Sequence, residues 1–67
     1  MNVKHIAQRV RSYRTIKGMT KRQLAESTGL TRATLHNVET ASHRPDIKTL
    51  ELIAKALDVP VGDLLGL

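Results

Sequence analysis

Apolar residues recur along the chain at intervals of three and four residues, the spacing typical of helices buried on one face. Ile6, Val10 and Tyr13 mark such a face near the start, and no stretch sustains the alternation expected of a strand. Capping residues, glycines and prolines interrupt the pattern. The sequence therefore predicts a compact all-α domain of five helices, over about 3–17, 21–28, 32–40, 47–57 and 60–65.

Several helix ends carry local signals. Thr20 and Gln23 have the spacing of a capping box, in which the threonine hydroxyl accepts from the glutamine amide and the glutamine side chain reaches back. Thr31 and Asp46 are placed to cap the third and fourth helices. Gly29 stands where the turn between the second and third helices is expected to need a positive φ.

Residues 21–40 form the most informative segment. Two short helices join across a five-residue turn, and Ala25 is small where the second of these helices passes close to the first. The apolar residues expected to fill the angle between them are Leu24, Leu30, Leu35 and Val38. This arrangement is a helix-turn-helix, whose second helix enters the major groove of DNA. Further along, the expected inward positions of the fourth helix are Ile47, Leu50, Ile53, Ala54 and Leu57.

Charge is distributed unevenly along the 67 residues. Residues 1–44 hold nine Lys and Arg against two acidic residues, a net charge of +7, whereas residues 45–67 carry −2. This excess predicts a polyanionic partner, and the alternative is a solvated basic face without a partner. Tyr13 is the single aromatic residue, which disfavours single-stranded nucleic acids, where stacked rings supply much of the binding. Duplex DNA is therefore the expected polyanion.

The chain resembles the Xre/Cro family of phage and bacterial repressors over about residues 6–65. The matching segments include Arg9-Val10-Arg11, Gly18-Met19-Thr20, Gln23-Leu24-Ala25-Glu26, Gly29-Leu30-Thr31, Val38-Glu39, Arg44-Pro45 and Thr49-Leu50. The resemblance implies a five-helix lambda-repressor-like domain spanning residues 1–67, with the helix-turn-helix at its centre. It also implies that Arg14 and Glu39 form a partly buried, structural ion pair.

By the same resemblance, the third helix is the recognition helix, and its outward residues are the candidates for base contacts. Arg32 can chelate guanine, Asn37 can bridge adenine, and Ala33 can contact a thymine methyl group. His36 can reach a base or a phosphate, and Arg32 can also serve a phosphate. The alternative interpretation is that these four are merely solvent-facing helix residues.

The family anchors phosphates at the start of the second helix and in the loop after the third, where helix dipoles and amides favour anions. The candidates here are Thr20, Lys21, Arg22, Thr40, Ser42, His43 and Arg44. The chain departs from the family at two of these places. Lys21 stands where Gln is common, and Ala41 stands where Gly is frequent.

Other chemistry finds little support in the sequence. His5, His36 and His43 lack the spacing of a metal site, and no nucleophile is grouped with a base. We therefore expect no enzyme, no cofactor and no metal. The chain has no cysteine, no apolar run of membrane-spanning length and charges where a signal peptide is apolar, so we expect a cytoplasmic, nucleoid-associated protein.

One helix-turn-helix reads too few base pairs to select a site in a genome, and the family dimerises on palindromic sites with half-sites about 34 Å apart. The apolar residues Val61, Leu64, Leu65 and Leu67 are the candidate dimer contact, Leu64 and Leu67 above all. The alternative is that these residues close the domain's own core. The dimer is expected either in free solution or only on DNA.

The function expected from these features is a sequence-specific, double-stranded-DNA-binding transcription regulator, most simply a repressor. Regulators of prophage genes and controller proteins of restriction–modification systems are both compatible subtypes. An antitoxin-type protein that neutralises a toxin partner and regulates its own operon is the alternative. A third possibility is a DNA-binding module cut from a longer protein.

Overall fold

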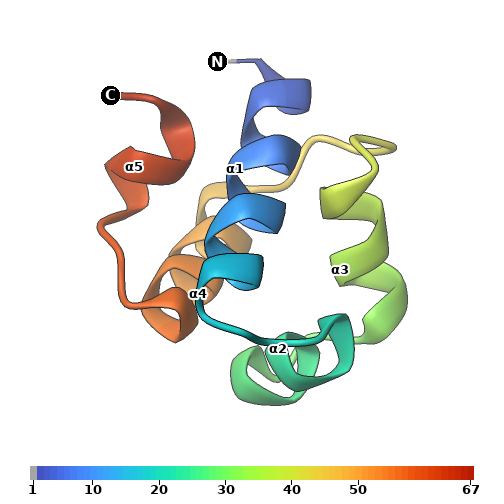
Figure 1. Cartoon of the computed structure of the whole chain (residues 1–67). Coiled ribbons are helices and arrows are strands. Elements are labelled where there is room, and N and C mark those ends of the chain that lie inside the picture. The colour runs from blue at the N-terminus through green and yellow to red at the C-terminus, as the bar shows by residue number, and fades with distance from the viewer. Residues whose placement is uncertain (1) are drawn as a thin grey trace.

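Five helices follow one another in the computed structural model, which describes residues 2–67 (Figure 1). Their bounds are α1 Val3–Ile16, α2 Lys21–Thr28, α3 Arg32–Glu39, α4 Ile47–Leu57 and α5 Val61–Leu65. No strand occurs within residues 2–67, so the predicted all-α class is confirmed. The first and third helices each end one residue earlier than predicted, and Pro60 precedes α5 as its N-cap instead of lying in its first turn.

Side-chain caps fix the starts of the first four helices. The Asn2 Oδ1 atom accepts a hydrogen bond from the Lys4 amide at 2.9 Å and begins α1. The predicted capping box of α2 is present, since the Thr20 hydroxyl accepts from the Gln23 amide at 3.0 Å. In return the Thr20 amide donates to the Gln23 side chain at 2.8 Å. Such caps satisfy amides that a helix leaves without intrahelical partners, so each one defines where its helix begins.

Helix α1 lies at the centre of the arrangement, with α3 on one side and α5 on the other (Figure 1). It also packs against α4, and α2 bridges α3 and α4. The buried residues that all five helices contribute to one apolar cluster are Ile6, Val10, Leu24, Ala25, Leu35, Val38, Leu50, Ile53, Ala54, Leu57 and Leu64. Because α3 meets this cluster with one face only, its opposite face is free for another partner.

Two apolar residues lie differently from the sequence prediction. Ile47 was expected on the inward face of α4, but it is the first residue of that helix, at the rim of the core, and 55% of it is exposed. Leu64 was expected in a dimer contact, yet it is fully buried because α5 packs on α1 and α4. The predicted contact between copies through the Leu64 side chain is therefore wrong, because no part of this residue reaches the surface. No helix within residues 2–67 has the length and apolar character needed to cross a lipid bilayer.

Candidate nucleic-acid interface

The turn between α2 and α3 sets the angle between these two helices. Gly29 has the left-handed conformation (φ +76°) that the sequence predicts, and its amide donates to the Ala25 carbonyl at 3.0 Å. The Thr28 hydroxyl donates to the Leu24 carbonyl at 2.9 Å and accepts from the Leu30 amide at 3.2 Å. These contacts leave few free backbone groups in the turn, so α3 departs from α2 in a defined direction.

Helix α3 divides cleanly into an inner and an outer face. Leu35 and Val38 point into the core and are buried, as expected from their spacing. The four residues predicted to contact bases lie on the other side: Arg32, Ala33 and His36 are exposed and Asn37 is half-buried. The Thr31 hydroxyl accepts from the Thr34 amide at 3.0 Å and caps the end of α3 at which Arg32 lies.

An ion pair ties the C-terminal end of α3 to α1. The Arg14 Nε atom lies 2.8 Å from Glu39 Oε2, and Arg14 Nη2 lies 3.1 Å from Glu39 Oε1. Arg14 Nη1 also donates to the Met19 carbonyl at 2.9 Å. Glu39 is almost fully buried, so the pair belongs to the interior and ties α3 to α1.

A second arginine of α1 reaches the same residue of α3, a contact that sequence analysis missed. Arg11 Nη1 donates to the Glu39 backbone carbonyl, at the end of α3 where carbonyls lack intrahelical partners. The only signal for this role is that Arg11 lies one turn before Arg14 on α1 and therefore shares its face. Two guanidinium groups of α1 thus hold the C-terminal end of α3.

The predicted phosphate contacts at the start of α2 are exposed as a group: Thr20, Lys21 and Arg22. The Thr20 hydroxyl accepts from the Gln23 amide and closes the capping box. Arg22 lies 3.9 Å from Glu26 one turn later, with both side chains largely in solvent. Such an exposed pair is weak, so Arg22 remains able to turn toward an anion.

The predicted phosphate contacts after α3 are exposed as well: Thr40, Ser42, His43 and Arg44. The Thr40 hydroxyl donates to the His36 carbonyl at 2.9 Å and lies 2.6 Å from the Ser42 hydroxyl. Between them Ala41 adopts the left-handed conformation, with φ +58°. The loop thus follows a path that suits glycine, although this chain has an alanine there.

A hollow of about 270 Å³ brings the two predicted classes of DNA contact together. Asn37 lines it from α3, while His43 and Arg44 line it from the loop. Val38 and Pro45 also line it, as do Thr34, Asp46 and Thr49, which were not predicted as site residues. Hydrogen bonds from the side chain and then the amide of Thr49 hold the pKa of Asp46 below its ordinary value, so this carboxylate stays charged as the cap of α4.

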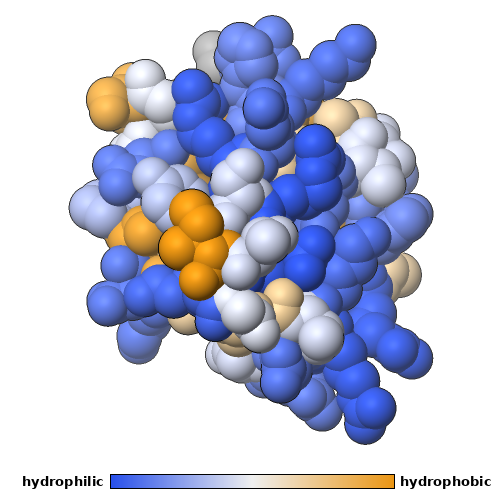
Figure 2. All heavy atoms as spheres, in the orientation of Figure 1, coloured by the Kyte–Doolittle hydropathy of each residue, from blue (hydrophilic) through white to orange (hydrophobic). Residues whose placement is uncertain are grey.

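The predicted dimer residues lie far from α3, on α5 and the residues after it. Val61 and Leu65 are half-buried, whereas 94% of Leu67 is exposed. Figure 2 shows apolar side chains in separate patches, at the C-terminal end of the chain, beside the segment between α4 and α5 and near the C-terminal end of α1, while the side that carries α3 is mostly hydrophilic. Among residues 2–67, no group of three or more His, Asp or Glu side chains is placed to hold a metal ion.

Proteins with similar sequences and structures include regulators from several bacteria. The control protein C.SmaI of Serratia marcescens is 42% identical over 66 residues, which cover 97% of this chain and 79% of that protein. The restriction-modification controller protein C.AhdI from Aeromonas hydrophila superposes with a TM-score of 0.89 at 31% identity, over 92% of this chain and 94% of that one. The biofilm master regulator SinR, solved in complex with DNA, superposes with a TM-score of 0.86 at 38% identity, over 90% of this chain and 97% of that one.

The chain spans only 42% to 56% of the length of further curated relatives, so those proteins hold additional segments. A helix-turn-helix family model matches residues 10–64, which is most of the chain. The matched region contains the capped α2, the glycine turn, α3 with its ion pair to α1, and α4. The chain therefore belongs to the helix-turn-helix family of Xre/Cro type, a family of DNA-binding transcription regulators and not of enzymes.

Proposed function

We propose that this protein is a repressor that binds a palindromic operator as a dimer, with α3 of each copy in the major groove. The observation that carries the proposal is the two-sided character of α3. Its inner side is locked into the core, and its outer side presents Arg32, Ala33, His36 and Asn37. A recognition helix needs both properties, because base reading depends on side chains held at a fixed angle to the duplex.

The outer side chains have the chemistry for direct readout. A guanidinium such as that of Arg32 donates two parallel hydrogen bonds to guanine O6 and N7, and the amide of Asn37 both donates to and accepts from adenine. Ala33 offers a methyl group to thymine, and His36 reaches a base or a phosphate. Asn37 is half-buried and lines the hollow beside Arg44.

Phosphate contacts on both sides of α3 complete the interface. The amide end of α2, with Lys21 and Arg22, serves one DNA strand, and the loop with Thr40, Ser42, His43 and Arg44 serves the other. Cationic side chains at both places position α3 in the groove. Their contribution to the free energy of DNA binding depends on salt concentration, because each neutralised phosphate releases counterions. The net charge of +7 over residues 1–44 supports this role.

Dimerisation is proposed through Leu67 together with the accessible parts of Val61 and Leu65. These residues form an apolar area on α5 and just after it, and Leu64 lies behind them in the core. A two-fold contact there leaves both copies of α3 free, because α5 and α3 lie on opposite sides of α1. The similarity to controller proteins supports the regulatory role. The similarity to SinR, which was solved in complex with DNA, supports DNA binding.

The test is an unbiased selection of duplex sites by the purified chain. A random library is incubated with the protein at about 0.15 M salt, where non-specific phosphate binding is weakened, and the retained DNA is sequenced. We expect an inverted repeat whose half-sites lie about one helical turn apart. A lack of enrichment contradicts DNA reading by this chain alone, and a single half-site contradicts the dimer.

Sedimentation with and without the selected site isolates the dimer contact. Leu67→Ser is expected to weaken cooperative binding of two copies while leaving binding to one half-site intact. Ile16→Ser serves as the matched control, because Ile16 is also an exposed aliphatic residue but lies at the end of α1. Equal effects of the two substitutions contradict the assignment of the dimer contact to α5.

A further inference from the structure

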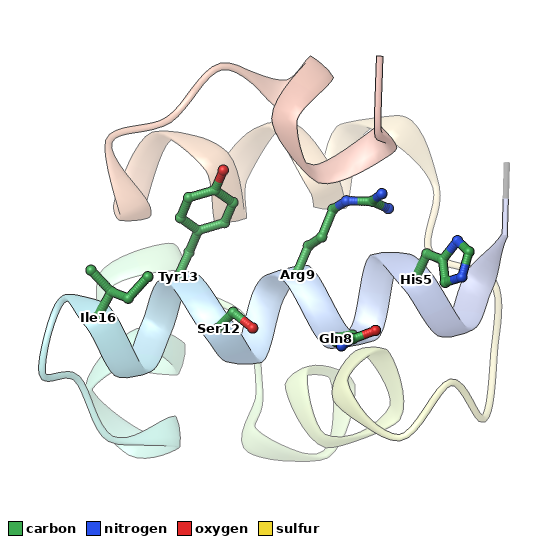
Figure 3. A pocket seen from close by; sticks show the side chains of 6 residues that line it. All are labelled: His5, Gln8, Arg9, Ser12, Tyr13 and Ile16. Atoms are coloured by element: carbon green, nitrogen blue, oxygen red, sulfur yellow. The ribbon is translucent and has the colours of Figure 1, made fainter.

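A groove of about 500 Å³ lies along the outer side of α1, next to α5 (Figure 3). Its lining residues are His5, Gln8, Arg9, Ser12, Tyr13 and Ile16. Arg9 and Tyr13 point from α1 toward the C-terminal part of the chain, and His5 and Ile16 mark the two ends of the groove. None of these residues belongs to the proposed DNA contact or to the α5 dimer contact.

Arg9 supplies an unneutralised positive charge in the groove. Its guanidinium lies so close to Gly66 that a methyl group added to this glycine would meet Arg9 Nη2 at 2.9 Å. The ion pairs within residues 2–67 are Arg14–Glu39 and Arg22–Glu26, so no described carboxylate lies within 4 Å of Arg9. Arg9 is half-buried, and a guanidinium without a described carboxylate partner is well suited to bind a carboxylate in a bidentate manner.

The other end of the groove is apolar. Ile16 is 77% exposed beside Tyr13, the single aromatic residue of the chain. Ile16 lies seven residues after Arg9 on the same helix, which is a separation of about 10 Å along the axis. The groove therefore offers a cation and an apolar surface two helical turns apart.

We propose that this groove binds an acidic amphipathic helix of a partner protein. A carboxylate of the partner pairs with Arg9, and an aliphatic side chain seven residues away on that helix packs against Tyr13 and Ile16. The groove follows α1 from His5 to Ile16, so a helix lying along it matches both features at once. The proposal does not rest on the proposed function, because α3 and the groove lie on different sides of α1.

A second copy of this chain does not offer the required pair of groups. The exposed aliphatic residues available to a partner copy are Ile16, Ile47, Leu52 and Leu67. None of them has an acidic residue seven positions before or after it. The chemistry therefore favours a different protein as the occupant over self-association.

The test is selection of displayed random peptides of about 16 residues, long enough to span the groove as a helix. Peptides that bind the unmodified chain are synthesised and titrated by calorimetry against Arg9→Gln and Ile16→Ser. We expect enriched peptides to carry a carboxylate and an aliphatic residue seven positions apart. Each substitution is expected to weaken their binding by about tenfold.

Matched controls are Lys55→Gln and Ile47→Ser, which remove an exposed charge and an exposed aliphatic group outside the groove. Both are expected to leave peptide binding unchanged. Failure to enrich any peptide, enrichment of peptides without a carboxylate, or equal binding to all variants overturns the proposal. A change in the sedimentation of the free chain caused by Ile16→Ser also overturns it, because the groove is then a contact between copies.

Discussion

The carboxylate of Glu39 is held by two nitrogens of the Arg14 guanidinium, with Nε 2.8 Å from Oε2 and Nη2 3.1 Å from Oε1. The same guanidinium donates to the Met19 carbonyl, just before α2 begins. One side chain of α1 therefore fixes the end of α3 and the entry to α2. This group thus adds polar contacts at both helices of the helix-turn-helix to their packing in the core.

Arg14→Met is expected to lower the free energy of unfolding by roughly 3–5 kcal/mol, because Glu39 then remains buried without its partner. Urea denaturation monitored by circular dichroism measures the loss. The double substitution Arg14→Met and Glu39→Met is expected to recover a large part of it, since no uncompensated charge remains. A double variant as unstable as the single one contradicts this account.

Ala41→Gly is expected to raise the free energy of unfolding by about 1 kcal/mol, because the left-handed conformation strains an alanine and suits glycine. In a domain of this size that gain corresponds to an increase in melting temperature of about 4–8 °C. Ala33→Gly is the matched control. It places glycine inside α3 and is expected to lower stability by a similar amount.

Asn37→Ala is expected to cost about 1–3 kcal/mol on the selected site and to relax the preference at one base position. Binding to random duplex DNA is expected to change little, because phosphate contacts are kept. Repeating the site selection with the Asn37→Ala variant measures both the loss of affinity for the selected site and the preference at that base position. An equal loss on specific and random DNA means that Asn37 does not read a base.

Lys21→Ala is expected to weaken binding to all duplexes alike and to reduce the slope of log K against log salt by about 0.9. Titrations at several salt concentrations on selected and random DNA measure that slope. Lys55→Ala, on the exposed side of α4, is the control and should leave the slope unchanged. A sequence-dependent effect of Lys21→Ala assigns this side chain to base contact instead.

Asp46→Asn is expected to remove one part of the acid dependence of stability. The folded-state pKa of Asp46 is lowered by its hydrogen bonds to Thr49, so its stabilising charge is present above about pH 4 and is lost as the pH falls through the folded-state pKa. Asparagine caps helices equally well but carries no charge. Melting temperatures should therefore differ most near neutral pH and converge in acid, whereas a constant difference contradicts the account.

Local signals predicted the helix starts because they act within a few residues. Thr20, Thr31 and Asp46 accept hydrogen bonds from amides three positions later, so spacing alone identifies them. The positive φ of Gly29 was predictable for the same reason. The inner and outer faces of α3 were also predictable from the spacing of its apolar residues, which placed Leu35 and Val38 inside.

Features that depend on distant elements were not predictable in this way. The sequence shows that Leu64 is an apolar residue at a helical spacing. It does not show whether α1 and α4 or a second copy of the chain covers this side chain. The reach of Arg11 to the Glu39 carbonyl spans 28 positions, and no spacing rule encodes it. The groove at Arg9 and Ile16 likewise depends on where α5 settles against α1.

The central position of α1 has a consequence for biosynthesis. Protein chains emerge from the ribosome with the N-terminal end first, yet α1 is covered by α3, α4 and α5, all of which are made later. Ile6 and Val10 therefore stay uncovered until Leu64 has left the exit tunnel and completed the core. Folding of this chain is thus delayed until α5 has left the exit tunnel, and nascent chains stalled before that point should be sensitive to protease.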